Sequence, residues 1–150
     1  MCGFVGMFNR DPSLNNEEQL MRMSHVIRHR GPDESDFIVR DSFCAAFRRL
    51  SIIDLAHGSQ PYTSPAGRFT AVFNGEIYNY RDLRVPLQEE GIEFFTNSEI
   101  EVIVALYRKY GPDFVKMLRG MFAIMIYDGD EKSCFVCRDP FGIKPLYYRE

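Results

Sequence analysis

The sequence predicts an α+β protein in which helices pack on largely antiparallel sheets. Segments with strand character come in pairs joined by short turns, and the order along the chain is strands, helix, strands, two helices, strands. That order is typical of helices set onto antiparallel sheets, because a parallel sheet needs strands and helices that alternate. With 150 residues and 45% hydrophobic side chains, residues 1–150 suffice for one domain with its own core.

The first half of the chain divides into a strand, a helix and a strand pair. Residues 2–9 are short, rich in β-forming residues and punctuated by glycine, which favours a strand. Asn16, followed three positions later by glutamine, is a start signal for a helix that Gly31–Pro32 ends. Two further strands, at residues 36–40 and 43–48, are joined by a tight turn.

The middle of the chain combines a loop, a strand and a helix. Several glycines and prolines predict a loop over residues 55–68. A strand over residues 69–73 is expected to end at an Asn74–Gly75 turn. Residues 81–90 favour a helix, which Pro86 should kink or shorten because proline lacks an amide donor.

The last third begins with a second long helix. Ser98 and Glu101 have the spacing of a capping box, and the helix behind them is expected to end at Gly111. A short helix over residues 113–119 follows. A β-hairpin then takes residues 121–127 and 133–137.

Composition excludes several classes of partner. Eighteen basic and 21 acidic residues give a net charge of −3, which offers no electrostatic footprint for nucleic acid. No apolar run approaches the roughly 18 residues of a membrane span, and no signal peptide is indicated. We therefore expect a cytoplasmic protein whose partners are small molecules or proteins.

The four cysteines indicate reduced thiols, as in a chain without a signal peptide. Cys134 and Cys137 have CxxC spacing, but residues three apart on a strand face opposite ways, so we interpret them as packing thiols. The sequence supports no metal site.

Cys2 is the residue that most suggests chemistry. Removal of Met1 would leave a cysteine with a free α-amine. The thiol could then attack a substrate while the amine, with a reference pKa near 8, accepts and returns the proton. The alternative is that a cysteine at the second position carries no function.

Two further segments offer groups that fit such a reaction. The Asn74 side chain and the Gly75 amide could converge on a developing oxyanion, although an Asn-Gly pair is also an ordinary turn. Arg49 ends an apolar strand, where it could clamp a substrate carboxylate or form an internal ion pair with Asp54 or Glu76.

Five segments then occur in an order and spacing that resemble one family. The segments are Cys2–Gly3, His29–Asp33, Arg49–Asp54, Asn74–Tyr80 and Arg138–Tyr148. Together they resemble the N-terminal glutaminase domain of glutamine-hydrolysing asparagine synthetases, which are class II glutamine amidotransferases. The resemblance covers residues 2–148, and no single segment is as specific as the set.

The resemblance implies a fold and a reaction. The fold is that of the N-terminal-nucleophile (Ntn) hydrolases, an αββα four-layer sandwich of antiparallel sheets, here expected to lack its last strands and the synthetase domain. The reaction is hydrolysis of glutamine to glutamate and ammonia through a thioester on Cys2, with Asn74 and Gly75 as the oxyanion hole. Arg49 would hold the α-carboxylate, and Glu76 and Glu99 the α-ammonium. The pocket would be lined by Leu50, Ser51, Ile52 and Ile53.

The same resemblance bears on cofactors and partners. This domain is expected to need no cofactor, since ATP and Mg²⁺ belong to a C-terminal synthetase domain that converts aspartate to asparagine. Glutamine is the expected substrate, and a homodimer is left open.

One departure from the family concerns binding. Glu99 stands where the family usually has aspartate, and its additional methylene leads to the hypothesis that glutamine binds more weakly. Two other functions stay open: the glutaminase half of a related amidotransferase acting on another carboxylate, such as that of a polysaccharide sugar, or a non-catalytic domain that keeps the fold.

Overall fold

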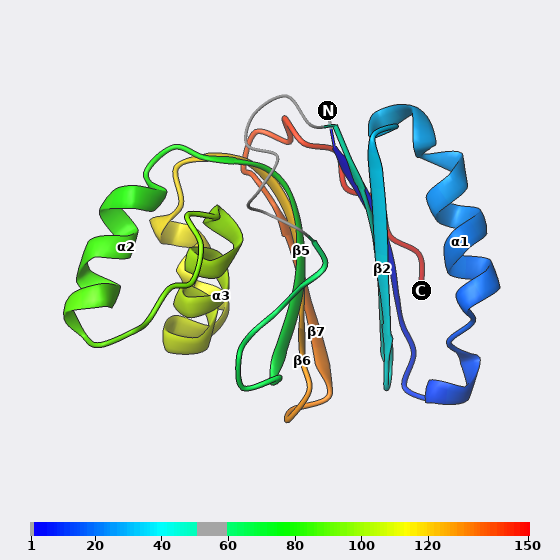
Figure 1. The fold of residues 1–150 in the computed structure, drawn as a ribbon, viewed down its shortest axis with the longest axis horizontal. Coiled ribbons are helices and arrows are strands. Elements are labelled where there is room, and N and C mark those ends of the chain that lie inside the picture. The colour runs from blue at the N-terminus through cyan, green and yellow to red at the C-terminus, as the bar shows by residue number, and fades with distance from the viewer. Residues whose placement is uncertain (1, 51–59) are drawn as a thin grey trace.

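Two antiparallel sheets lie face to face between helices in the computed structural model, which describes residues 2–50 and 60–150. Helix α1 (Glu17–Val26) covers the outer face of one sheet, and α2 (Tyr80–Glu89) and α3 (Glu99–Tyr110) cover the outer face of the other (Figure 1). The layers therefore run α, β, β, α, which confirms the predicted fold class.

The first sheet has the strand order β1-β3-β2 and is antiparallel throughout. Its strands are β1 (Gly3–Phe8), β2 (Glu34–Arg40) and β3 (Phe43–Arg49). Asp41, with φ of 45°, makes the predicted tight turn between β2 and β3. The predicted cap of α1 is also present, because the Gln19 amide donates to Asn16 Oδ1 at 3.1 Å.

The second sheet has the order β4-β5-β6-β7 and is antiparallel as well. Its strands are β4 (Tyr62–Thr63), β5 (Phe69–Ile77), β6 (Gly120–Asp128) and β7 (Ser133–Arg138). The hairpin of β6 and β7 confirms the prediction for that segment, and β4 is a short addition within the expected loop.

The prediction that β5 ends at an Asn74–Gly75 turn is wrong. The ladder with β6 continues through both residues to Ile77, which lies opposite Gly120. The two strands can stay paired because neither has a side chain at the tightest contacts: a Cβ on Gly75 would lie 2.0 Å from the Met121 carbonyl oxygen, and one on Gly120 would lie 2.1 Å from that of Glu76.

Two helix predictions also need correction. Of the two effects expected of Pro86, a kink or a shortening, the shortening does not occur: α2 continues through Pro86 to Glu89, and the exposed position lets water satisfy the carbonyl that loses a donor. Ser98 stands at the N-cap of α3 but its side chain makes no capping hydrogen bond. Glu101 instead accepts from the amides of Phe95 and Thr96, at 3.0 and 3.3 Å, so the expected capping box is not formed.

The short helix predicted after Gly111 is a 3₁₀ helix, Gly111–Met117. Shorter 3₁₀ turns also occupy Pro12–Leu14 and Arg28–Arg30.

The core has separate parts on the two faces of each sheet. The largest cluster fills the space between β5, β6 and the helices α2 and α3, with Phe114 and Leu106 among its buried side chains. A smaller cluster between the two sheets is centred on Tyr127, whose ring stacks on Phe43 at 5.2 Å between centroids. The space between the sheets is therefore apolar only over part of its length.

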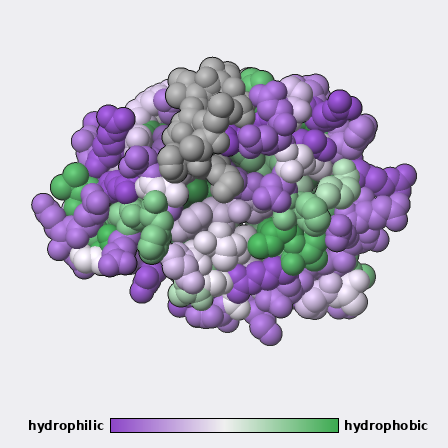
Figure 2. All heavy atoms as spheres, viewed as in Figure 1, coloured by the Kyte–Doolittle hydropathy of each residue, from purple (hydrophilic) through white to green (hydrophobic). Residues whose placement is uncertain are grey.

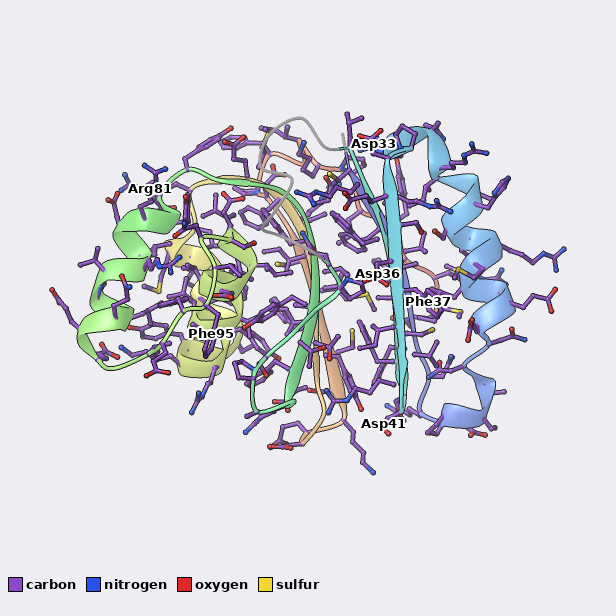
Figure 3. All side chains as sticks on the ribbon, in the orientation of Figure 1. Asp33, Asp36, Phe37, Asp41, Arg81 and Phe95 are labelled. Carbon is purple, nitrogen blue, oxygen red and sulfur yellow. The ribbon has the colours of Figure 1, made fainter. Side chains whose placement is uncertain are left out.

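The outer strand β2 differs from the rest of the first sheet. Phe37 and Val39 remain exposed on it, and Figure 2 shows a hydrophobic patch over β2 on a face that is otherwise mainly hydrophilic. Asp36 and Phe37 leave this strand on opposite sides, with Asp36 toward the second sheet (Figure 3). No helix among the described residues is long and apolar enough to span a membrane.

Candidate active site

The period of two along each strand brings the predicted site residues to one space. On β5 the core residue Val72 faces the other sheet, so Asn74 and Glu76 face it too. On β3 the core residue Ala45 faces the same space, and Arg49 continues that face. Cys2 stands two positions before Phe4 of the same cluster. Four predicted residues, from β3, β5 and the position just before β1, therefore converge between the sheets, beyond the end of the apolar cluster.

A cavity of about 330 Å³ occupies this place, which is within the size range of small-molecule sites. It is lined by Cys2, Phe47, Arg49, Leu50, Gln60, Phe73, Asn74, Gly75, Glu76, Ser98, Glu99, Met121 and Lys144. A neighbouring cavity of about 380 Å³ shares Phe47, Arg49 and Gln60 with it and extends along β2. In Figure 1 the start of β1, in dark blue, lies at the same end of the sandwich as the exit from β5.

Cys2 is held at the wall of this cavity by contacts on both sides. Its Sγ accepts from the Leu50 amide at 3.4 Å and lies 3.9 Å from the Leu50 carbonyl oxygen. The Arg30 guanidinium donates to the Cys2 carbonyl oxygen through Nε and Nη2, each at 3.4 Å. The next residue, Gly31, packs directly on the backbone of β3, because a Cβ there would lie 2.4 Å from the Arg48 carbonyl carbon. The thiol is half-buried and lies next to the cavity.

Asn74 and Gly75 line the cavity from the second sheet. Asn74 is 7% exposed, and its side chain lies on the face of β5 toward the first sheet. Both residues are fixed by pairing with β6, opposite Ala123 and Phe122. A rigid strand therefore carries the two candidate oxyanion donors, where the sequence suggested a turn.

Arg49 forms an internal ion pair, as one of the two alternatives for it expected, but with Glu34, which was not among the partners named there. Its Nη1 lies 3.2 Å from Glu34 Oε2, and the two residues are partners in the β2–β3 register. Among the described residues its acidic partner is Glu34 and not Glu76; Asp54 lies outside them. The Glu34 side chain is 52% exposed, so this pair lies at the rim of the site.

Glu99 reaches the cavity from the first turn of α3. Its Oε1 accepts from the Ile77 amide at 2.7 Å, which ties the helix to the end of β5. Burial raises the pKa of this carboxyl to about 7, the Ile77 amide opposes that change, and the nearby Glu76 adds to it. The Glu99 carboxyl therefore titrates near neutral pH. It also stands in the first turn of α3, where a carboxylate complements the helix dipole.

Gln60 and Lys144 are cavity residues that sequence reasoning did not find. The register of β4 and β5 pairs Tyr62 with Ala71, so the next step places Gln60 opposite Phe73. There the Gln60 side-chain oxygen accepts from the Phe73 amide at 2.6 Å, in place of a main-chain carbonyl. Lys144 is only 6% exposed. No local pattern marks either residue, because each reaches the cavity through a turn that the sequence did not predict in detail.

The remaining predicted pocket residues divide into two groups. Leu50 contacts Cys2 as described and lines the cavity. Ser51, Ile52 and Ile53 lie outside the described residues, so their place in the pocket stays a prediction.

The CxxC cysteines lie apart from this site. Cys134 packs against the cluster between the sheets and Cys137 against the cluster under the helices, which confirms that they face opposite ways. Burial raises the pKa of each thiol to about 12. Within the described residues, no group of three or more His, Cys, Asp or Glu side chains could hold a metal ion.

Comparison with known proteins adds family relationships to this geometry. Residues 1–150 match a family described as "Glutamine amidotransferase domain". Asparagine synthetase (glutamine-hydrolyzing) 1 of Bacillus subtilis is 45% identical over 151 residues, covering 99% of this chain and 24% of that protein. Asparagine synthetase B (glutamine-hydrolyzing) of Escherichia coli is 38% identical over 148 residues, covering 98% of this chain and 26% of that protein. The chain thus spans about a quarter of the length of these relatives.

A solved structure supports the fold. Glutamine phosphoribosylpyrophosphate amidotransferase from B. subtilis, complexed with ADP and GMP, aligns with a TM-score of 0.72 over 97% of this chain and 38% of that one. Identity is 20%, so the likeness concerns the fold, and it confirms the Ntn-hydrolase architecture.

Proposed function

The chain belongs to the glutamine amidotransferase domain family, and we propose that it hydrolyses glutamine to glutamate and ammonia with Cys2 as nucleophile. The observation that carries this proposal is the placement of Cys2 against one cavity with Asn74 and Gly75. A nucleophile and two neutral hydrogen-bond donors around one small space are the elements that acyl transfer needs.

The reaction proceeds in two stages once Met1 has been removed. The Cys2 thiol passes its proton to its own α-amine, and the sulfur attacks the side-chain amide carbon of glutamine. The Asn74 side chain and the Gly75 amide stabilise the resulting oxyanion. The carbon–nitrogen bond then breaks, the proton moves to the leaving nitrogen, and ammonia departs. Water attacks the γ-glutamyl thioester and releases glutamate, which restores the thiol.

The charges around the cavity fit the zwitterionic end of glutamine. Arg49 supplies a cation for the α-carboxylate, and its half-exposed partner Glu34 can move aside. Glu76 and Glu99 supply carboxylates for the α-ammonium. Leu50, together with the adjacent Ser51, Ile52 and Ile53, would close the pocket around the methylene groups.

The wider reaction is part of the same proposal. Two relatives are named as glutamine-hydrolyzing asparagine synthetases, and this chain spans about a quarter of each. We propose that the ammonia serves conversion of aspartate to asparagine by a C-terminal synthetase domain, where ATP and Mg²⁺ act, while the glutaminase domain uses no cofactor. A cytoplasmic location and a homodimer belong to this proposal, and sedimentation velocity tests the dimer.

The test combines intact mass with a glutaminase assay. Loss of Met1 should be visible as a mass that begins at Cys2, and the purified protein should release glutamate and ammonia from glutamine. Cys2→Ala should lower kcat by at least about a thousandfold, because the nucleophile is lost. Cys137→Ala removes a thiol on the opposite face of the second sheet and should leave kcat unchanged. Full activity in Cys2→Ala would disprove the proposal.

A further inference from the structure

Asp139, directly after β7, has a buried carboxylate that binds main-chain amides. The residue is 1% exposed. Its Oδ1 accepts from the amides of Phe141 and Ile143, at 3.1 and 2.9 Å. Its Oδ2 accepts from those of Phe122 and Lys144, at 3.2 and 3.0 Å. Both oxygens are therefore satisfied by backbone groups, which cannot rotate away as side chains can.

These contacts keep the carboxylate charged and in place. Burial by itself raises the pKa of Asp139. The hydrogen bonds from the amides of Lys144, Ile143, Phe122 and Phe141 lower it by more, so that the pKa lies below its ordinary value. A charge buried in this way is tolerated only while its donors stay aligned. The turn after β7 is thus fixed to β6 at one point, Phe122, whose carbonyl also accepts from the Asp139 amide at 2.8 Å.

Phe122 is the residue opposite Gly75 in the β5–β6 ladder. A Cβ on Gly75 would lie 2.7 Å from Phe122 Cα and 2.0 Å from the Met121 carbonyl oxygen, so the two backbones touch with no side chain between them. A shift of β6 at Phe122 would therefore move the Gly75 peptide directly. The same turn ends at Lys144, which lines the cavity with Cys2.

We propose that Asp139 is a positioning residue for glutamine hydrolysis, which fixes Phe122 so that the Gly75 amide points at the oxyanion. This inference rests on the proposed function, and it assigns a role to a carboxylate that touches no substrate. An oxyanion donor acts mainly in the transition state, so its misalignment lowers kcat and leaves KM nearly unchanged.

The first experiment compares Asp139→Asn with Asp128→Asn. Asp128 ends β6, the strand that contains Phe122, on the side away from the cavity. It is 5% exposed and also accepts hydrogen bonds from two main-chain amides. Asp139→Asn turns one acceptor oxygen into a donor and should lower kcat about 10- to 100-fold, with KM within threefold of the wild type. Asp128→Asn should lower the melting temperature yet keep kcat per folded molecule within twofold. Alkylation of Cys2 by iodoacetamide, which needs no oxyanion donor, should keep its rate in both variants.

A milder pair covers the case in which Asp139→Asn fails to fold. Gly142, with φ of 66°, lies in the turn that Asp139 organises, and Gly67, with φ of 74°, lies in the turn between β4 and β5. Alanine costs a similar backbone strain at either position. Gly142→Ala should lower kcat several-fold with KM unchanged, and Gly67→Ala should leave both constants unchanged.

The outcomes separate this role from the proposed function. An inactive wild-type protein would overturn both. An active wild type whose Asp139→Asn variant keeps its kcat, or loses activity only through KM or the folded fraction, would overturn the role of Asp139 alone. Equal effects of Gly142→Ala and Gly67→Ala would do the same.

Discussion

The two ends of strand β6 are built from similar parts and differ in what holds them. At the end away from the cavity, Asp128 accepts from Arg68 Nε and Nη2 at 2.9 and 2.7 Å, and the Arg68 side chain is 40% exposed. At the cavity end, Asp139 is held by four main-chain amides. Asp128 also accepts from the amides of Asp130 and Glu131, so the far end depends partly on a flexible surface side chain, whereas main-chain amides alone hold Asp139. We therefore expect the far end to tolerate change better than the cavity end.

The side chains between the two sheets also differ between the far end and the cavity end. At the far end the aromatic rings of Phe43 and Tyr127 stack, and Arg40 donates to Thr70 across the gap at 3.3 Å. At the cavity end the corresponding faces carry Cys2, Asn74 and Glu76. The strand faces that point between the two sheets thus carry apolar side chains at the far end, where they form a core. At the cavity end the same faces carry polar side chains, and these line the site.

The largest expected difference between the ends concerns glycine. Alanine at Gly75 would place its Cβ 2.0 Å from the Met121 carbonyl oxygen, and backbone cannot move away without breaking the ladder. Gly75→Ala should therefore cost about 3 kcal/mol or more of unfolding free energy. At Gly129 the closest atom, at 2.7 Å, is the end of the flexible Arg40 side chain, so Gly129→Ala should cost less than about 1 kcal/mol.

Urea unfolding followed by circular dichroism measures both free energies. Equal losses in Gly75→Ala and Gly129→Ala would show that the close contact at the cavity end is not what limits substitution there.

The next largest effect concerns two polar residues on one face of β5. Asn74→Ala removes a proposed oxyanion donor and should lower kcat about 100- to 1000-fold, with little change in KM. Thr70, four residues earlier and fully buried, hydrogen-bonds to Arg40 at the far end. Thr70→Val should reduce stability by about 1 kcal/mol and leave kcat unchanged, because its hydroxyl contacts Arg40 and Thr63 and Thr70 does not line the cavity. A wild-type kcat in Asn74→Ala would exclude the side chain as a donor.

Much of the fold followed from local pattern. The strands expected at residues 43–48 and 121–127 and the cap signal at Asn16 each depend on nearby residues, and each was found in the structure. The extension of β5 past Asn74 could not be predicted, because it depends on the absence of a side chain at Gly120, which is far away in the sequence. Ser98 and Glu101 had the right spacing for a cap, but the Phe95 and Thr96 amides compete for the same carboxylate.

The site divides along the same line. Cys2, Arg49 and Asn74 were candidates from their residue types, the resemblance added the role of Glu76, and strand alternation brings these residues together. The ion pair of Arg49 with Glu34 depends on the β2–β3 register, which the sequence did not specify to the residue. Gln60 and Asp139 act through main-chain amides of distant strands, and hydrogen bonds of that kind leave no periodic signal.

The smallest expected effect is a pH dependence of KM, in which the two carboxylates in the first turn of α3, Glu99 and Glu101, should differ. Glu99 has a pKa raised to about 7, first by burial and then by Glu76, and it faces a cavity that also contains Arg49 and Lys144. Only the ionised carboxylate attracts the α-ammonium of glutamine, so KM should fall as the pH rises from 6 to 8, by up to about tenfold.

Glu99→Gln should raise KM and remove this pH dependence, since an amide does not titrate in this range. Glu101→Gln changes the other carboxylate of this turn, which accepts hydrogen bonds from the Phe95 and Thr96 amides. This variant should keep the pH dependence of KM. Glu99→Asp sharpens the comparison: an unchanged KM would contradict the hypothesis that the longer side chain weakens glutamine binding. If KM depends on pH equally in Glu99→Gln and the wild type, the group that titrates is not Glu99 but another group of the cavity. Steady-state glutaminase assays across this pH range decide among these results. The bound ammonium of the substrate keeps Glu99 ionised, so the effect of pH on Glu99 should appear in KM rather than in kcat.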